Sequence, residues 1–241
     1  MPRIAEVAGW LTAAPKPVIC LDTCDILEIV ECLDWEGQGR ATRGVTCIEP
    51  AQRLLDTLAV NPDRAQIIIT DLVAVEWNQN IAGIRAKAAA FLTKVDEIFG
   101  QPYQAAGFAG TVLPARVPVS GSSLVADLEA LSLALLNQAT RLNHYTAQIN
   151  LALQRVMNKR RPSHDGHIKD SINFEHYLEL ARRLRAGGFA EEIVFVSKNK
   201  KDYWDGNLSH IHPDLLPEIT DAAVGIEFFG SLDAALGFLH I

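Results

Sequence analysis

Positive charge is scarce in this chain of 241 residues. Its 22 Lys and Arg residues are outnumbered by 29 Asp and Glu residues, which gives a formal net charge of −7 at pH 7. This balance argues against a broadly basic coat for nucleic acid, although it is compatible with a local basic groove. Hydrophobic residues make up 49% of the chain and charged residues 21%, so we expect a folded protein and not a disordered one.

Cysteine pairs and long apolar runs are also missing. The four cysteines all lie in the first fifth of the chain, and no two of them form a C-x-x-C pair. A structural zinc site is therefore not expected, and buried free thiols in a reducing cytoplasm are the simpler interpretation. No run approaches the roughly 18 apolar residues of a membrane span, and the apolar part of residues 1–14 is too short for a signal peptide. We expect a soluble, cytoplasmic protein that does not span a membrane.

Short apolar runs alternate with helical patterns along the chain. Residues 18–21 and 66–70 have the continuous apolar character of buried strands in a parallel sheet, and residues 192–197 and 223–229 provide two further strands. Helices are predicted at residues 23–30, from 50 to about 61, from 71 to 98, at 168–185 and at 232–239, with a polar loop at 34–44. Strand followed by helix, repeated, indicates an α/β fold with a mostly parallel sheet flanked by helices.

The middle of the chain has a different character. Residues 101–121 are rich in Gly, Pro and Ala and predict a long loop, whereas residues 122–161 predict one long helix or an antiparallel pair. We interpret residues 100–162 as a helical insertion within a single domain of residues 1–241.

Several acidic residues recur at comparable places. Asp22 directly follows the first strand, Glu76 lies near the start of the helix after the second, and Asp202 follows the third. Asp170 begins the apolar stripe of its helix. Taken singly, each has an ordinary explanation as a helix-end or turn residue. Together they converge at the carboxyl edge of a parallel sheet, where such folds bind ligands, and their mutual repulsion favours a hard cation such as Mg²⁺ or Mn²⁺.

The sequence around these acids resembles the PIN-domain nucleases. The segments that carry the resemblance are Leu21-Asp22-Thr23, residues 68–77 around Glu76, Lys169-Asp170-Ser171, and residues 195–203 with the pattern Asn-Lys-Lys-Asp-Tyr. It covers residues 16–98 and 163–239, is nearest to the larger PIN-like branch, and implies a three-layer PIN-like fold. By this resemblance Asp22, Glu76 and Asp170 would bind the metal, and Asn199 or Asp202 would complete the site.

The resemblance implies a Mg²⁺- or Mn²⁺-dependent endoribonuclease that hydrolyses phosphodiester bonds. Two alternatives stay open: a structure-specific DNA nuclease, and a catalytically inactive PIN-like module that binds RNA or protein. Asn199, where many PIN domains have Asp, keeps the last alternative in consideration. The family further suggests an RNA substrate, an antitoxin-like protein partner and a homodimer.

Basic residues flank the predicted site. Lys198, Lys200 and Lys201 surround the last motif, residues 159–161 precede the Asp170 helix, and both groups suit contact with phosphates. Tyr203 and Trp204 could stack on a base or pack in the core. The histidines at positions 164, 167, 210 and 212 are not assigned to the site. Helix capping by Thr23 or Asp25 is expected, with capping the simplest role for Asp25.

Overall fold

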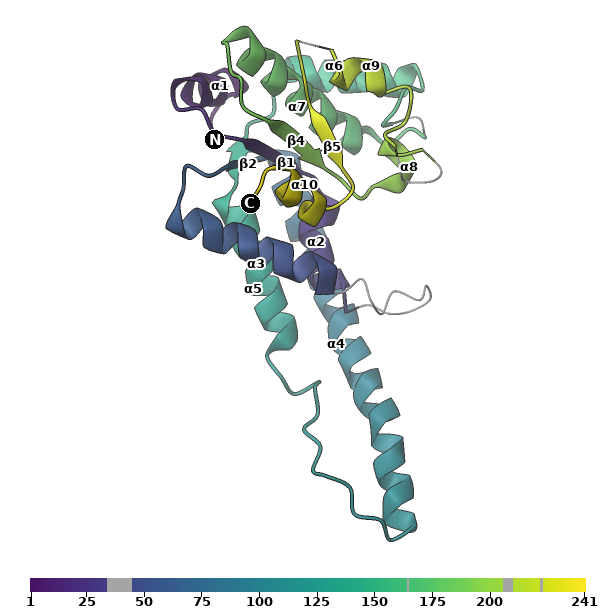
Figure 1. Ribbon diagram of the computed structural model, residues 1–241. Helices are drawn as coiled ribbons and strands as arrows, with labels where there is room; N and C mark the ends of the chain where they lie inside the picture. Colours follow the sequence, from purple (N-terminus) through teal and green to yellow (C-terminus); the bar gives the residue numbers. More distant parts are fainter. Residues whose placement is uncertain (34–44, 164, 206–209, 222) are drawn as a thin grey trace.

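A computed structural model describes residues 1–33, 45–163, 165–205, 210–221 and 223–241 (Figure 1). The predicted loop at 34–44 and His164 lie outside these residues. The strands are β1 (Val18–Leu21), β2 (Gln66–Thr70), β3 (Thr140–Leu142), β4 (Ile193–Val196) and β5 (Glu227–Phe229). The helices are α1 (Ile4–Ala13), α2 (Thr23–Glu31), α3 (Val45–Val60), α4 (Asp71–Phe108), α5 (Leu124–Gln138), α6 (Thr146–Met157), α7 (Ile168–Ala186), α8 (Lys200–Tyr203), α9 (Leu216–Ile219) and α10 (Leu232–Phe238).

Within the described residues, five strands form one sheet in the order β3-β2-β1-β4-β5. Every neighbouring pair is parallel; in the central pair, for example, Cys20 is opposite Phe195. The chain builds outward from β1 through β2 to β3, and then returns to the other side of β1 with β4 and β5. The order of the strands therefore reverses between β1 and β4, and open α/β sheets bind ligands beyond the carboxyl ends of strands at such a reversal.

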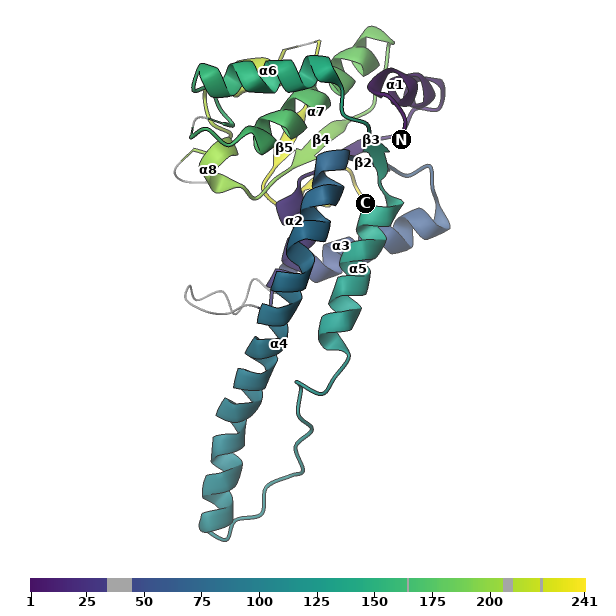
Figure 2. The same cartoon turned by 180° about the vertical axis from the view of Figure 1, so that it is seen from behind.

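Alternating residues of the central strands supply the two halves of the core. Ile19 and Leu21 of β1 face a cluster formed with α2, α3, α4, α5 and α10, whereas Val18 and Cys20 face α1, α7 and the segments that follow β4 and α9. Figures 1 and 2 show these two groups of helices on opposite faces of the sheet. The predicted α/β class with a parallel sheet between helical layers is confirmed.

The element predictions were correct for the central strands and incomplete elsewhere. The strands at 18–21, 66–70 and 193–196 and the helices at 23–31, 168–186 and 232–238 are as expected. The segment from 100 to 162 is not purely helical, because β3 pairs in parallel with β2 and forms an edge of the sheet. Helix α1 was not predicted, and α3 begins five residues before Pro50, which lies inside it.

The long helix α4 also continues beyond its predicted end. It runs to Phe108 and includes Gly100 and Pro102, so the predicted loop from 101 is shorter than expected. Figures 1 and 2 show its C-terminal half projecting away from the sheet, with the following segment returning beside it to α5. We call residues 93–123 the arm. In the described part of the chain, no helix is both long and apolar enough to cross a membrane.

Candidate functional site at the carboxyl edge of the sheet

Asp22 lies at the point where β1 ends and α2 begins. It is the N-cap residue of α2, and its Oδ1 accepts a 2.8 Å hydrogen bond from the backbone N–H of Thr23. The expectation that Thr23 or Asp25 caps this helix is therefore wrong: both lie inside α2. Capping by Asp22 holds its carboxylate at the carboxyl edge, because an N-cap side chain must turn back toward the first helical N–H groups.

The other contacts of Asp22 come from the neighbouring elements. Its Oδ2 accepts a 2.7 Å hydrogen bond from Ser197 Oγ, directly after β4. Asn173 Nδ2 on α7 lies 3.4 Å from Oδ1, and Thr70 Oγ1 at the end of β2 donates to Asn173 Oδ1 at 2.5 Å. The ends of β1, β2 and β4 and one face of α7 are thus joined through a single buried carboxylate.

Glu76 reaches the same edge from the second turn of α4. Its Oε2 accepts a 2.7 Å hydrogen bond from Thr23 Oγ1, and its Oε1 forms a 2.8 Å ion pair with Lys169. Because Thr23 also donates its backbone N–H to Asp22, it bridges the two predicted acids. Lys169 precedes Asp170 in the chain, so it connects α4 to the start of α7.

Asp170 and Asp202 complete the group of acids. Asp170 lies in the first turn of α7, and Asp202 is buried in α8. Asn199, the N-cap residue of α8, donates from Nδ2 to Asp202 Oδ2 at 3.0 Å, and its side chain also hydrogen-bonds Asp170. Both candidates from the last motif therefore lie beside Asp170, with Asn199 between the two carboxylates.

The pKa shifts show that the carboxylates interact with one another. Burial, together with the charges of Asp22, Asp202 and Glu76, raises the pKa of Asp170 to about 8. Burial also raises the pKa of Asp22, against the hydrogen bond from Ser197 and with an additional contribution from Glu76. Acids from four separate segments therefore share one electrostatic environment.

The oxygen-only donor set fits a hard divalent cation in its chemistry. In geometry, however, the described residues contain no group of three or more His, Cys, Asp or Glu side chains arranged to hold a metal ion. Protein donors occupy the oxygens instead: Ser197 and Thr23 hold Asp22, while Thr23 and Lys169 hold Glu76. One more acid has an unpartnered atom, because Oδ1 of Asp25 is buried without a hydrogen-bond partner.

Asp25 is the acid that the sequence interpretation undervalued. Its side chain is 7% exposed, and burial and the charge of Asp22 raise its pKa to about 8. Cys24 Sγ lies between Oδ2 of Asp22 at 3.5 Å and Oδ2 of Asp25 at 3.6 Å. Asp25 therefore adjoins the site as a buried carboxyl group, which helix capping does not account for.

Ser197 and Asn173 were also missed. Ser197 follows β4 as Asp22 follows β1, and Asn173 lies one turn beyond Asp170 on α7. The rule that selected Asp22, a polar residue directly after a strand, would have selected Ser197 if it had been applied to hydroxyl side chains as well as to carboxylates. Asn173 lies inside a helix, and only its spacing of three residues from Asp170 places it near the site.

The three lysines predicted to contact phosphates differ in how far other residues already pair with them. Lys198 forms an ion pair with Glu28, and burial lowers its pKa. Lys201 is exposed and forms an ion pair with Asp165, and Lys200 is exposed on α8. Arg161 donates to the carbonyl of Lys201, so the two predicted basic groups do meet beside α8.

The aromatic residues after the lysines belong to the core. Tyr203 is fully buried and donates from its hydroxyl to the Asp170 carbonyl at 3.0 Å, and Trp204 Nε1 donates to the Ser197 carbonyl at 2.9 Å. Their rings pack against Phe228. Of the two open interpretations, core packing is therefore correct. Both residues nevertheless position site residues through the backbone.

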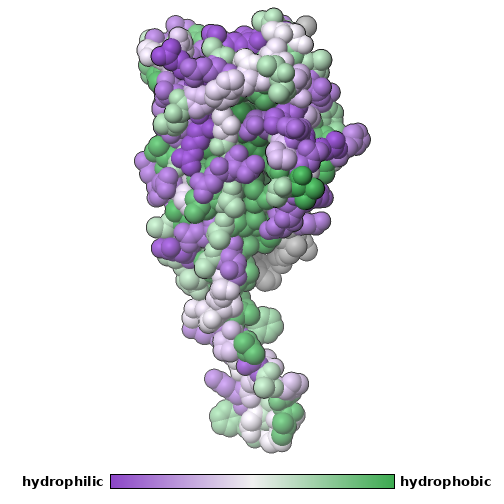
Figure 3. Space-filling model, turned by 90° about the vertical axis from the view of Figure 1, so that its left-hand side faces the viewer, coloured by the Kyte–Doolittle hydropathy of each residue, from purple (hydrophilic) through white to green (hydrophobic). Residues whose placement is uncertain are grey.

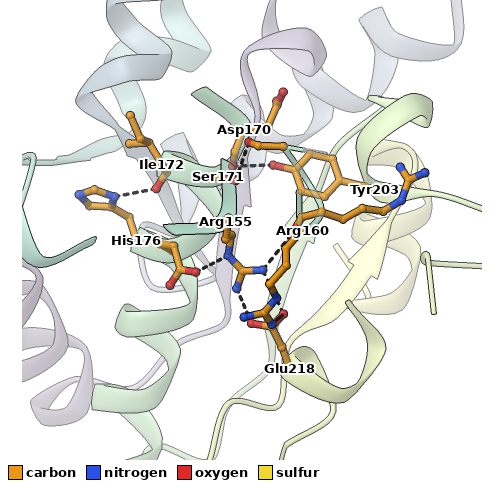
Figure 4. A network of polar contacts seen from close by, with 11 residues as sticks. Arg155, Arg160, Asp170, Ser171, Ile172, His176, Tyr203 and Glu218 are labelled. Carbon is orange, nitrogen blue, oxygen red and sulfur yellow. Dashed lines mark hydrogen bonds and ion pairs between the residues drawn. The ribbon is translucent and has the colours of Figure 1, made fainter. Parts of the chain in front are cut away.

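A buried ion network connects α6 and α9 to α7, the helix that carries Asp170 (Figure 4). Arg155 of α6 forms ion pairs with Glu175 of α7 and Glu218 of α9, and Arg160 joins Glu218 at 3.0 Å. The Arg155 guanidinium also lies 4.9 Å from the centroid of the Phe174 ring. This network fixes α6 and α9 against the helix that carries Asp170 and Asn173.

No protein-family model, curated protein or solved structure gives a significant match to this chain. The resemblance to the PIN-domain nucleases therefore stays a prediction from the motifs.

Proposed function

We propose that this protein is a Mg²⁺- or Mn²⁺-dependent endoribonuclease whose site is the carboxyl edge of the sheet. One observation carries the proposal: Asp22, Glu76, Asp170 and Asp202, from four segments of the chain, interact electrostatically at the point where the strand order reverses. Carboxyl groups buried together at a cost to their ionised forms are a common feature of functional sites.

The chain's own residues would orient and tune these acids. Ser197 and the Thr23 N–H fix Asp22, Thr23 Oγ1 fixes Glu76, and Asn199 lies between Asp170 and Asp202. Asp22, Glu76, Asp170 and Asp202, with the amide oxygen of Asn199, would hold the divalent cation. Such an ion, when bound, lowers the pKa of a coordinated water and stabilises negative charge on a phosphoryl group.

A polyanionic substrate needs positive charge next to this acidic edge. Lys200, Lys201 and Arg161 provide it around α8, and Lys169 provides it at the start of α7. These side chains suit phosphate contacts that hold a strand without identifying its bases. Lys198 is the weakest of the predicted contacts, since Glu28 already pairs with it.

The test is cleavage of end-labelled single-stranded RNA and of branched DNA, with Mg²⁺, with Mn²⁺ and with a chelator. We expect RNA cleavage that requires the divalent ion and is abolished by Asp22→Asn and by Asp170→Asn. Asp214→Asn is the matched control, because Asp214 is an exposed carboxylate outside the cluster.

Each other outcome contradicts part of the proposal. Cleavage of branched DNA alone would assign a DNA nuclease, and retained Mn²⁺-dependent cleavage in both variants would exclude this site. If calorimetry detects no Mn²⁺ binding and no substrate is cleaved, the protein is a non-catalytic module.

A further inference from the structure

Two of the four cysteines contact each other where α2 meets α3. Cys32 is the C-cap residue of α2, and Cys47 lies in the first turn of α3. Their side chains form a hydrogen bond with each other, although they belong to different helices. Both are present as thiols. Two thiols in direct contact are the arrangement from which a disulfide bond forms without a large movement of the backbone.

Both sulfur atoms lie against the last turn of α2. Cys32 Sγ donates to the Ile29 carbonyl at 3.2 Å, and Cys47 Sγ donates to the Glu28 carbonyl at 3.6 Å. The same Glu28 carbonyl accepts the backbone N–H of Cys32 at 2.9 Å. Cys47 is thus held beside the backbone of Cys32 as well as beside its side chain. The contact therefore follows from the way α3 packs on the end of α2.

The other two cysteines lack the features of a reactive thiol. Cys20 is fully buried in β1, and burial raises its pKa. Burial also raises the pKa of Cys24, and the charges of Asp25 and Asp22 raise it further. Because the thiolate is the form of cysteine that reacts with oxidants, these two side chains are poor targets.

Cys32 and Cys47 differ from each other in a way that suits two successive roles. The hydrogen bond from Cys47 lowers the pKa of Cys32, whose side chain is partly exposed. Cys47 is 6% exposed, and its hydrogen bond to Cys32, together with burial, raises its own pKa. Cys32 is therefore the thiol that an oxidant reaches first, and Cys47 is the neighbour that reacts with the oxidised Cys32.

From these contacts we propose that Cys32 and Cys47 form a reversible disulfide in the presence of a peroxide and thereby link the end of α2 to the first turn of α3. The Cys32 thiolate attacks one oxygen of hydrogen peroxide, the O–O bond breaks, and a sulfenic acid and one water result. The Cys47 sulfur then attacks the Cys32 sulfur and forms the S–S bond. The hydroxide that leaves takes the Cys47 proton and becomes a second water.

The two thiols together lose two electrons and two protons to the peroxide. A small-molecule thiol returns the disulfide to two thiols by exchange. The link would stabilise the helix that begins at Asp22, because closing a loop of about 15 residues restricts the unfolded chain. We expect the Tm of the oxidised protein to be higher by roughly 5–10 °C. This inference does not depend on the proposed nuclease activity.

The experiment treats the folded full-length protein with a small molar excess of hydrogen peroxide. The remaining thiols are then alkylated in denaturant, and the chain is cleaved after Glu without reduction. This cleavage isolates Cys32 in residues 32–36 and Cys47 in residues 37–49. Mass spectrometry should find these two peptides joined, and dithiothreitol should separate them. The peptide of residues 7–28, which contains the other two cysteines, should be alkylated at both.

Two serine variants test the two roles, and a third variant tests proximity. In Cys47→Ser, a dimedone probe should trap the sulfenic acid on Cys32. In Cys32→Ser, Cys47 should stay reduced at the same dose. The third variant is Val112→Cys, which places a thiol on the arm, the narrow projection in Figure 3, where Val112 is 95% exposed. This thiol should be oxidised without joining another cysteine of the same chain.

Three results would overturn the proposal. The first is recovery of both Cys32 and Cys47 unlinked after peroxide treatment, whether alkylated or oxidised to sulfinic acid. The second is a link from either peptide to residues 7–28, which would show that the contact does not determine the pairing. The third is oxidation of Cys47 in Cys32→Ser at the wild-type rate. An unchanged Tm of the linked protein would contradict the stabilisation of α2 against α3.

Discussion

Ser197 Oγ donates a 2.7 Å hydrogen bond to Asp22 Oδ2 and thereby ties the end of β4 to the end of β1, the two strands between which the strand order reverses. Burial disfavours the ionised form of Asp22, and this hydrogen bond counteracts that effect. The hydroxyl of Ser197, which follows β4, therefore helps to keep the carboxylate of Asp22, which follows β1, in its ionised form.

Ser197→Ala tests this relationship. Without the hydroxyl, the pKa of Asp22 should rise further, and the free energy of unfolding at neutral pH should fall by about 1.5–3 kcal/mol, the usual contribution of a hydrogen bond to a charged group. Carboxyl NMR titration measures the pKa, and urea unfolding measures the stability. Ser123→Ala is the control: Ser123 also donates to a carboxylate, Asp127, but at an exposed position, so its loss should cost under about 0.5 kcal/mol. Equal effects of the two substitutions would contradict the role of burial.

The pH dependence of stability should reflect the buried acids. The pKa of Asp25 rises from 3.8 to about 8 on folding, and that of Asp170 does the same. Between these values the folded protein keeps a proton that the unfolded chain has released. The contribution of these two raised pKa values to the free energy of unfolding is therefore fully present below pH 3.8 and is lost as the pH rises toward about 8. Thermal unfolding should show stability that decreases from acidic to mildly alkaline pH.

Asp25→Asn should flatten this dependence. It removes the titrating group and should raise the Tm near pH 8 by about 2–4 °C for each ~1 kcal/mol recovered. Asp165→Asn is the control, because the pKa of Asp165 is lowered on folding whereas that of Asp25 is raised. The Lys201 hydrogen bond lowers the pKa of Asp165 to about 2, so its contribution is present above 3.8 and lost as the pH falls through about 2. An unchanged slope in Asp25→Asn between pH 4 and 8 would show that Asp25 is not the buried acid responsible.

The fold was predictable where side-chain pattern and burial agree. The runs at 18–21, 67–69 and 193–196 are apolar at every position because the sheet buries both of their faces, so their sequences identify them directly. Strand β3 was not recognised because its three residues, Thr140-Arg141-Leu142, lie at an edge and only Leu142 is buried. Helix α4 continues through Gly100 and Pro102, two residues of low helix propensity. Contacts between the helix and the returning segment, such as the Ser120–Asp96 hydrogen bond, help to stabilise the helix there, and the sequence does not reveal them.

The candidate site was partly predictable for a related reason. Asp22 and Asp202 were found because each follows a strand, Glu76 because it begins the helix after a strand, and Asp170 because it begins an apolar helical stripe; the resemblance to the PIN-domain nucleases then grouped the four. Whether such residues touch depends on side-chain geometry, which the sequence does not contain. The pairing of Lys169 with Glu76 and the burial of Asp25 are of that kind.

Lys169 should compete with a divalent cation for Glu76. Its ammonium lies 2.8 Å from Oε1 and is half exposed, so the pair is worth about 0.2–1 kcal/mol. Lys169→Met should therefore strengthen Mn²⁺ binding by less than about tenfold, as measured by calorimetry. Lys200→Met, a substitution on exposed α8, is the control for the general loss of one positive charge. If Lys169→Met weakens Mn²⁺ binding, the cation does not use Glu76 in competition with the lysine.

Arg155 should be the most costly of the basic residues to replace. Its guanidinium is buried between Glu175 and Glu218 and donates to the Arg161 carbonyl at 2.8 Å (Figure 4). Arg155→Met leaves Glu175 as a buried charge without its counter-ion, a change that typically costs about 3–5 kcal/mol. Arg160→Met removes only the exposed partner of Glu218 and should cost under about 1 kcal/mol.

Urea unfolding of these variants measures both costs, and a double substitution identifies their origin. If the uncompensated carboxylate is the cause, Arg155→Met with Glu175→Gln should recover part of the stability that Arg155→Met loses, because no charge is then left buried. If the lost packing against Phe174 is the cause, the double variant should be no more stable than the single one. In either case the start of α7 loses support, so Asp170 and Asn173 should show changed NMR chemical shifts in Arg155→Met and unchanged shifts in Arg160→Met.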